Sequence, residues 1–197
     1  MILPIYPYGH PILRVETEPI EAMTPEIEAL ISDMIETMHN AAGIGLAAPQ
    51  VGRTERLFVA DLRPMAEDIE DELGELPEWA QHPLVFINPR IVDEDEASLC
   101  DYEEGCLSIP DLRELVTRPD VVRLRYRDHD FVEREIEATG VLARVVQHET
   151  DHLDGVLFVD HLSPLRRRLL KRRLREIARG EVEADYPLAP PAAAQSA

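Results

Sequence analysis

Two histidines and a glutamate within five residues are the strongest chemical signal in the sequence. His148 and His152 are four positions apart, so on a helix both imidazoles project from one face and can reach a single metal ion. Glu149 follows the first histidine and is placed to take a proton from a metal-bound water. The alternative is a surface helix that carries two histidines by chance. The neighbouring Val145 and Val146 argue against it, because they indicate a buried helix on which imidazoles need partners.

Cys106 is the candidate third ligand, because a catalytic metal site usually has three protein ligands and one open position. It follows Gly105, which permits an unusual backbone conformation, and a thiolate is a strong soft ligand. Taken alone, a single cysteine is more typical of a small buried hydrophobic residue. The metal-site hypothesis therefore depends on what accompanies Cys106.

Three segments together resemble the three motifs of the peptide deformylase family. They are GIGLAAPQ at 43–50, EGCLS at 104–108 and QHETDHLDG at 147–155, in the family's order and at plausible spacing. The resemblance extends from about Tyr8 to Leu170. It implies a metal-dependent hydrolase that removes the N-formyl group from the initiator methionine of nascent polypeptides and releases formate.

The resemblance also implies a role for each matching residue. Fe(II) is the expected metal ion, although Zn(II), Ni(II) or Co(II) could occupy the same ligands. Glu149 would accept a proton and pass it to the departing amine. The side-chain amide of Gln50 and the backbone N–H of Leu107 would stabilise the negative oxygen of the tetrahedral intermediate. The implied metal ligands are Cys106, His148 and His152.

Ile44 and Gly45 are the expected substrate contacts. Ile44 would help line an apolar pocket for the methionine side chain, and a glycine-lined edge lets an extended peptide pair with backbone. The simpler interpretation is that Gly43 and Gly45 give loop flexibility. An ion pair between Glu104 and Arg118 near the site is a further hypothesis.

Local patterns predict the elements that position these residues. Thr24 and Pro25 begin an amphipathic helix that ends near Asn40, and residues 41–50 are interpreted as a shaped loop. Residues 57–60 and 84–87 are strand candidates. A hairpin would pair 122–127 with 133–137, placing Arg127, Arg125 and Arg123 opposite Glu133, Glu135 and Glu137.

Two more helices complete the expected fold. One opens at Thr139-Gly140, carries the histidines and ends at Leu153, with Gly155 positioned to stop it. The other follows Ser163-Pro164 and has an apolar stripe of Leu165, Leu169, Leu170, Leu174 and Ile177. With the resemblance, these elements predict an α+β fold: antiparallel sheets around a central buried HExxH helix, with a C-terminal helix.

Length and composition fit one catalytic domain at 1–180. The Pro- and Ala-rich segment 181–197 is expected to be a disordered tail, and the acidic stretch 67–78 a surface insertion. No apolar run is long enough to cross a membrane, and the N-terminus does not resemble a signal peptide. The two cysteines are expected to be reduced, which favours the cytoplasm.

The charge is unevenly distributed along the chain. The formal net charge is −19, but residues 161–180 carry +7 and the rest −26. The basic helix 164–180 is either a solvated face or an anchor to ribosomal RNA, and the resemblance supports the anchor. Lys171 is the only lysine, which suits either a high-salt host or a genome biased toward arginine codons.

Two rival functions remain open at this point. One is another enzyme, either a general HExxH metallopeptidase or a deformylase-like hydrolase of formylated small molecules. The other is a non-catalytic ribosome-binding relative. The presence of Glu149, Gln50 and Cys106 argues against the second, because binding alone does not need a base.

Overall fold

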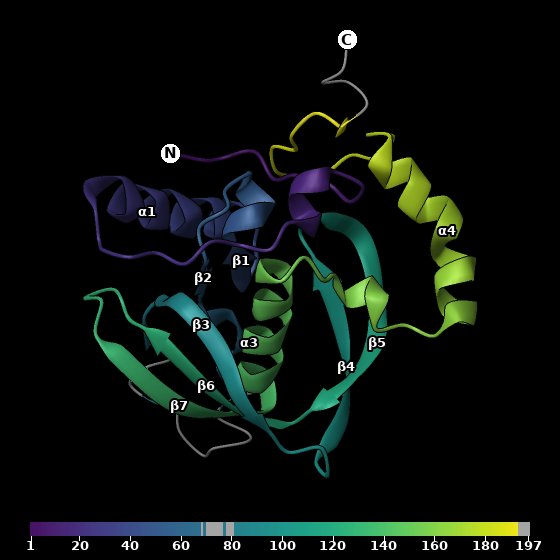
Figure 1. Ribbon diagram of the computed structural model, residues 1–197. Helices are drawn as coiled ribbons and strands as arrows, with labels where there is room; N and C mark the ends of the chain where they lie inside the picture. Colours follow the sequence, from purple (N-terminus) through teal and green to yellow (C-terminus); the bar gives the residue numbers. More distant parts are fainter. Residues whose placement is uncertain (68, 70–76, 78–80, 193–197) are drawn as a thin grey trace.

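The computed structural model describes residues 1–67, 69, 77 and 81–192, which form an α+β fold around one central helix (Figure 1). The helices of this part are α1 (Pro25–Asn40), α3 (Gly140–Leu153) and α4 (Pro164–Ala178). The strands are β1 (Gly45–Ala47), β2 (Leu57–Ala60), β3 (Leu84–Glu94), β4 (Leu99–Cys106), β5 (Ile109–Pro119), β6 (Val121–Arg127) and β7 (Glu133–Thr139). Short 3-10 turns include Ala48–Val51 and Phe158–Asp160. The expected fold class is confirmed.

All strands pair antiparallel, in two sheets. The larger sheet has the order β1-β2-β3-β6-β7, and β4 and β5 form a separate two-stranded sheet. Helix α3 stands between the two sheets, with β6 and β7 on one side and β4 and β5 on the other (Figure 1). Side chains on α3 can therefore meet residues from both sheets.

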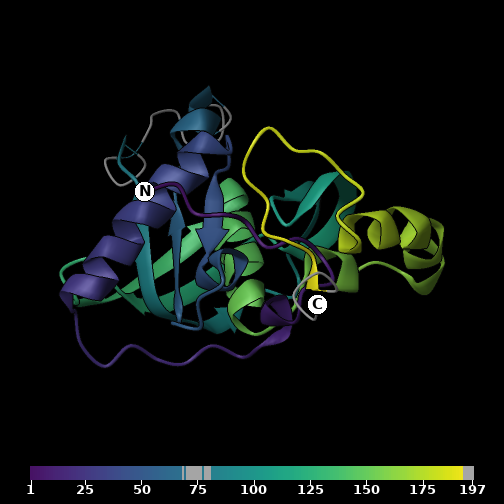
Figure 2. The ribbon, with the colours of Figure 1, turned by 90° about the horizontal axis from the view of Figure 1, so that it is seen from above.

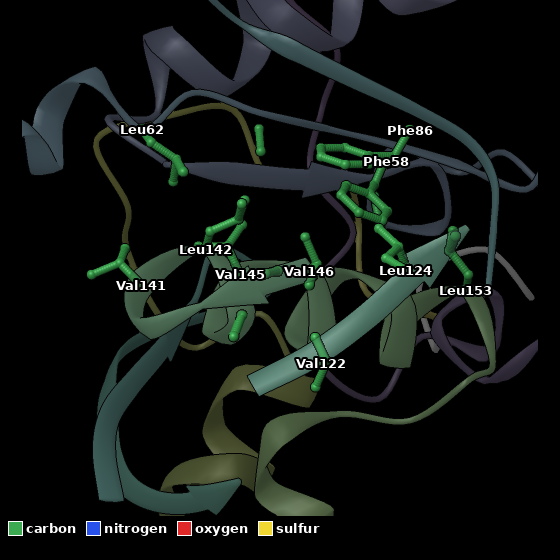
Figure 3. Close-up of a cluster of buried hydrophobic side chains, with 14 of the residues drawn as sticks. Phe58, Leu62, Phe86, Val122, Leu124, Val141, Leu142, Val145, Val146 and Leu153 are labelled. Carbon is green, nitrogen blue, oxygen red and sulfur yellow. The ribbon is translucent and has the colours of Figure 1, made fainter. Parts of the chain in front are cut away.

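The strand β2 is buried on both faces, which explains its continuous apolar run. Phe58 faces the cluster that includes Val146 of α3, and it stacks on Phe86 with ring centroids 4.5 Å apart (Figure 3). Leu57 and Val59 face the other way, into the cluster formed with α1. Alternate side chains of a strand point to opposite faces, so one strand joins the two cores. This packing fixes α3 against the sheet.

The predicted helix boundaries are confirmed. Thr24 caps α1 by accepting a hydrogen bond from the Ile27 N–H at 3.3 Å, and Pro25 takes the first helical position. Helix α3 ends at Leu153, and Gly155 has a left-handed backbone with φ of 73°. In α4 only part of the predicted apolar stripe is buried: Leu174 and Ile177 are buried, whereas Leu165 and Leu169 are exposed.

The β6–β7 hairpin has the predicted register. Arg127, Arg125 and Arg123 lie opposite Glu133, Glu135 and Glu137. Arg125 and Glu135 form an ion pair at 2.9 Å, and Arg127 and Glu133 approach to 3.8 Å. Arg123 instead contacts Asp93 of β3 at 3.7 Å, because β6 has a second neighbour strand on that side.

Two local expectations are corrected by the structure. The loop predicted at 41–50 contains β1 and the start of the turn Ala48–Val51. A three-residue strand is too short to show a period, and β1 is defined by its pairing with β2, Gly45 opposite Ala60. The candidate strand 84–87 also continues to Glu94, where it pairs with β6.

The C-terminal segment also differs from expectation. Residues 181–192 are described and make defined contacts, so the prediction of a disordered tail is wrong for them. Leu188 bridges to Ile5, and the Ala189 N–H donates to the Ile5 carbonyl at 2.8 Å. Residues 193–197, and most of the acidic stretch predicted at 67–78, lie outside the described residues. Within the described part, no helix combines the length and apolarity needed to cross a bilayer.

Candidate metal centre and catalytic cleft

Helix α3 presents its two histidines from a buried face. His148 is 9% exposed and His152 1%, and their rings meet edge-on with centroids 5.1 Å apart. The helix stays buried because Val145, Val146 and Leu153 pack in the core shared with the larger sheet (Figure 3). The alternative of a surface helix with two chance histidines is therefore wrong.

Cys106 is brought to the histidines by the end of β4. The β4–β5 register shifts between Gly105, which is opposite Arg113, and Cys106, which is opposite Ile109. Its sulfur lies 3.2 Å from Nε2 of His152. One ligand atom from each of Cys106, His148 and His152 falls within 4.8 Å of the other two. The three predicted ligands thus lie together, although Cys106 comes from β4 and both histidines come from α3.

The surroundings of these atoms fit a metal ion of the kind that sulfur and imidazole bind. Nδ1 of His148 is 2.8 Å from the Glu104 carboxylate, which fixes the ring and leaves Nε2 facing the thiol. Oε2 of Glu149 and Nδ1 of His152 are buried and have no hydrogen-bond partner among the residues that the structure describes. A buried carboxylate oxygen without a partner is energetically costly. A cation held by the three candidate ligands, with its bound water, would supply the missing partner.

Glu104 is the centre of a buried charge network behind the ligands. It accepts hydrogen bonds from Arg118 at 2.7 and 3.1 Å and from Arg144 at 2.8 Å. The Glu104–Arg118 pair hypothesised from the sequence is therefore confirmed. Burial raises the pKa of Glu104, but the bonds from His148 and Arg118 outweigh it and hold that pKa well below its usual range.

The same network continues on the outer side of α3. Arg118 also donates to Asp151 at 2.7 Å, and His161 lies 2.7 Å from the same carboxylate oxygen. The sequence analysis missed Arg144, Asp151 and His161. Asp151 lies inside the histidine motif, so its position was visible, but its partners depend on the β4–β5 sheet.

Gln50 points its amide group at Cys106, one of the candidate metal ligands. Its side-chain oxygen accepts the Ala47 N–H at 2.8 Å, which fixes the orientation of the amide. The NH₂ group then donates toward Cys106 Sγ and Ser108 Oγ, each at 3.4 Å. An amide donor is therefore aimed at the centre, as an oxyanion site requires.

Glu149 occupies space that only a glycine leaves free. A Cβ on Gly45 would overlap its carboxylate. Burial raises the pKa of Glu149 to about 7, with the nearby His148 lowering it and Glu104 raising it. A carboxylate with a pKa near neutrality can both take up and release a proton under physiological conditions.

A cleft of about 1330 Å³ opens onto this centre. Its lining includes the predicted substrate contacts Ile44 and Gly45, together with Leu107. The C-terminal segment contributes a further part of the lining that the sequence analysis missed, namely residues 182–186 and Leu188. Their only sequence signal is the alternation of Val182, Ala184, Tyr186 and Leu188 with polar residues or proline.

A thiol, two imidazoles and a buried carboxylate at the end of a peptide-sized cleft define a metal-dependent hydrolase. The family model of polypeptide deformylase matches residues 2–168. The peptide deformylase of Salinibacter ruber is 63% identical over 95% of this chain and 94% of its own length. The chain belongs to the peptide deformylase family, and it removes the N-formyl group from nascent peptides.

Solved structures agree with this assignment. The peptide deformylase of Ehrlichia chaffeensis has a TM-score of 0.80 and 34% identity, covering 92% of this chain and 99% of that one. A Met-Ala-Ser-bound class I type b peptide deformylase from Acinetobacter baumannii has a TM-score of 0.71 and 32% identity, covering 82% and 99%. The match includes all three segments that resemble the family's motifs.

Proposed function

We propose that residues 1–180 act as one catalytic domain in which Cys106, His148 and His152 hold a single divalent ion, Fe(II) in the native enzyme. The proposal rests on the convergence of their three ligand atoms within 4.8 Å. A bound ion of this kind supplies Lewis acidity toward the formyl oxygen and makes hydroxide available near neutral pH. A thiolate among the ligands favours a soft transition metal over magnesium or calcium.

The protein's own groups then transfer protons and stabilise the negative charge that develops on the substrate. Glu149 is the general base and afterwards the acid that protonates the departing amine, and its near-neutral pKa suits both steps. Gln50 and the backbone N–H of Leu107 stabilise the oxygen that becomes negative. Removing one such donor typically costs roughly 3–4 kcal/mol of barrier. Ala47 has a supporting role, because its N–H orients the Gln50 amide.

The substrate is a formyl-methionyl peptide lying along β1. Strand β1 is the edge of the larger sheet, so an extended peptide can pair with its free side at Gly45. Ile44 would contact the methionine side chain. The Met-Ala-Ser bound to the Acinetobacter baumannii relative supports a methionyl peptide as the ligand of this enzyme.

Anaerobic purification with metal analysis and peptide turnover tests the catalytic proposal. We expect about one Fe(II) per chain and release of formate from formyl-Met-Ala. Glu149→Ala should keep the metal but lose at least about a hundredfold in kcat, the usual contribution of a general base. Glu137→Ala, an exposed carboxylate on β7, is the matched control and should change neither. Retained turnover in the Glu149 variant would reject the assignment of Glu149 as the general base. One zinc ion per chain in the purified protein would reject Fe(II) as the native metal.

We also propose that helix 164–180 binds ribosomal RNA, which places the enzyme in the cytoplasm at the site of synthesis. Arg168, Lys171 and Arg175 are exposed and, within the described residues, belong to no ion pair; Arg167 is exposed too, and its charge helps to lower the pKa of Asp160. Changing all four to glutamine should weaken ribosome binding and reduce its salt dependence. The control changes Arg123, Arg125, Arg127 and Arg134 of the hairpin. Equal affinity of both variants would reject the anchor.

A further inference from the structure

The chain crosses the mouth of the cleft after α4, through residues 181–192, here called the C-terminal strap. Gly180 ends the helix with φ of 70°, and the Glu181 N–H donates back to the Glu176 carbonyl at 2.9 Å. In Figure 2 the strap is the yellow loop that leaves α4 and passes beside the β4–β5 hairpin. It lies beyond residue 168, where the match to the family model ends.

The strap is seated on the body of the protein by alternate side chains. Val182, Tyr186 and Leu188 are half-buried and pack on the hydrophobic clusters, whereas Glu183 and Asp185 are exposed. Its far end is fixed to the N-terminal segment. The N–H of the fully buried Ile5 donates to the Pro187 carbonyl at 2.8 Å, and the Ile5 carbonyl accepts the Ala189 N–H.

Tyr186 connects the strap to the catalytic loop. Its hydroxyl donates to the Leu107 carbonyl at 2.8 Å. Burial, with the nearby Cys106, raises the pKa of Tyr186 to about 12, so the hydroxyl keeps its proton and remains a donor. Leu107 follows the ligand Cys106, and its own N–H is the proposed oxyanion donor. The Tyr186 bond therefore restrains the residue on which that donor depends.

The exposed strap residues give the cleft an acidic outer wall. Glu183 and Asp185 line the cleft, as does Glu103 on β4. Asp111 lies there too, but it already contacts Arg173 at 3.3 Å. Among the described exposed residues of the lining, Arg113 is the one that carries a positive charge. The part of the peptide that extends outward from the formyl-methionine would meet a net negative surface.

We propose that the C-terminal strap is the outer wall of the peptide groove: Tyr186 positions Leu107, and Glu183 and Asp185 select basic side chains downstream of the formyl-methionine. The inference rests on the proposed role of Leu107 and on the deformylase function of the family. Tyr186 is a positioning residue, since it acts through Leu107. The two carboxylates act directly on the substrate by long-range attraction.

The first test is Tyr186→Phe, which keeps the ring packing and removes only the hydroxyl. We expect kcat for formyl-Met-Ala to fall about fivefold, the effect of one neutral hydrogen bond of roughly 1 kcal/mol. KM, metal content and melting temperature should stay within error, because the strap remains seated. An unchanged kcat, or a loss explained by lower metal content or stability, overturns the positioning role.

The second test compares formyl-Met-Ala-Arg with formyl-Met-Ala-Glu at low salt. At about 8 Å a pair of charges in water interacts by about 0.5 kcal/mol, favourably for the arginine peptide and unfavourably for the glutamate peptide, so the enzyme should favour the arginine peptide about fivefold in kcat/KM. Glu183→Gln/Asp185→Asn should bring the ratio close to one, and so should about 1 M salt. The unmodified enzyme should release formate from formyl-Met-Ala in the same assay, which separates a failed charge preference from a failure of the catalytic proposal.

The control for charge is Glu181→Gln/Glu137→Gln, which removes the same net charge outside the cleft lining. Glu181 is on the strap and contacts Arg179 at 3.8 Å, and Glu137 is on β7. The control should keep the arginine preference. If it narrows the ratio as much as the strap variant does, the preference comes from overall charge and the selection by the strap is rejected. Equal use of both peptides by the unmodified enzyme rejects it directly.

Discussion

Two groups of ion pairs in this enzyme, one behind the metal centre and one on the β6–β7 hairpin, differ chiefly in burial. In the network behind the metal centre, the Arg118 and Glu104 side chains are 5% and 3% exposed. On the β6–β7 hairpin, the Arg125 and Glu135 side chains are 55% and 43% exposed. Both pairs join an arginine to a glutamate on the neighbouring antiparallel strand. Their surroundings therefore determine what the pairs do.

Burial changes the role of an ion pair from mild support to fixed geometry. In water, a pair gains little because solvent screens it and two long side chains lose freedom. In the interior, the charges hold one another in place because leaving either alone is very costly. Glu104 thereby holds His148 in a single orientation, while the hairpin pairs help to fix register. The sharpest test of this contrast is to remove one partner from each group.

The largest effect is expected from Glu104→Ala. The change leaves two buried guanidinium groups without their shared carboxylate and should lower the free energy of unfolding by about 3–5 kcal/mol. It also frees Nδ1 of His148, so metal affinity should fall about 10–100-fold. Urea unfolding of the metal-free protein measures the first quantity, and titration with Zn(II) or Co(II) under a competing chelator measures the second.

Glu103→Ala is the matched control for this prediction. Glu103 is the preceding residue of β4, but it is exposed. We expect the free energy of unfolding to fall by less than about 0.5 kcal/mol and metal affinity to stay unchanged, as for most surface substitutions. If Glu104→Ala cost no more than Glu103→Ala, burial would not be what distinguishes the two groups.

The sequence predicted the hairpin pairs but little of the buried network, and the reason is physical. The hairpin is local, so alternating arginines and glutamates around a turn define both the strands and their register. The network joins Glu104 to Arg118 and to Arg144, which is 40 residues further along the chain. Only the β4–β5 sheet and the packing of α3 bring these residues together, and the β4–β5 pairing was not predicted.

The catalytic centre was predictable to a greater extent than its walls. The spacing of His148 and His152 expresses helical geometry directly, and the resemblance supplied Cys106 and Gln50. The C-terminal strap had no such signal. Its Pro- and Ala-rich composition is typical of disorder, whereas its order comes from Ile5 and Leu107, at distant positions in the sequence. Tertiary contacts of this kind override composition.

Asp61 is a buried carboxylate outside the network behind the metal centre. It therefore tests the effect of burial on stability separately from any effect on the metal site. Its side chain is 2% exposed, and the hydrogen bond from Arg63 lowers its pKa to about 2 against a reference of 3.8. Because the folded-state pKa is depressed, the stabilisation is complete above the unfolded value near 4 and is lost as pH falls toward 2. The difference corresponds to about 2 kcal/mol at neutral pH.

Asp61→Asn should therefore lower the free energy of unfolding by about 2 kcal/mol at pH 7 and by much less near pH 2, with metal affinity unchanged. Urea unfolding of both proteins between pH 2 and pH 7 measures this loss of stability. Asp93→Asn is the control, since the Asp93 side chain is 65% exposed and only 3.7 Å from Arg123 at its nearest approach. It should cost less than about 0.5 kcal/mol at pH 7. A loss that grows as pH falls would contradict the assignment.

The smallest effect is expected on the hairpin, where Arg125 and Glu135 lie directly opposite each other. A double-mutant cycle with Arg125→Ala and Glu135→Ala should give a coupling of about 0.5 kcal/mol at low salt and nothing measurable near 1 M salt. The same cycle between Arg125 and Glu137, which are diagonal neighbours, should show less coupling at any salt. A coupling above about 1.5 kcal/mol, or one that salt does not change, would mean that the hairpin pair is effectively desolvated. The two groups of ion pairs would then differ in position and not in kind.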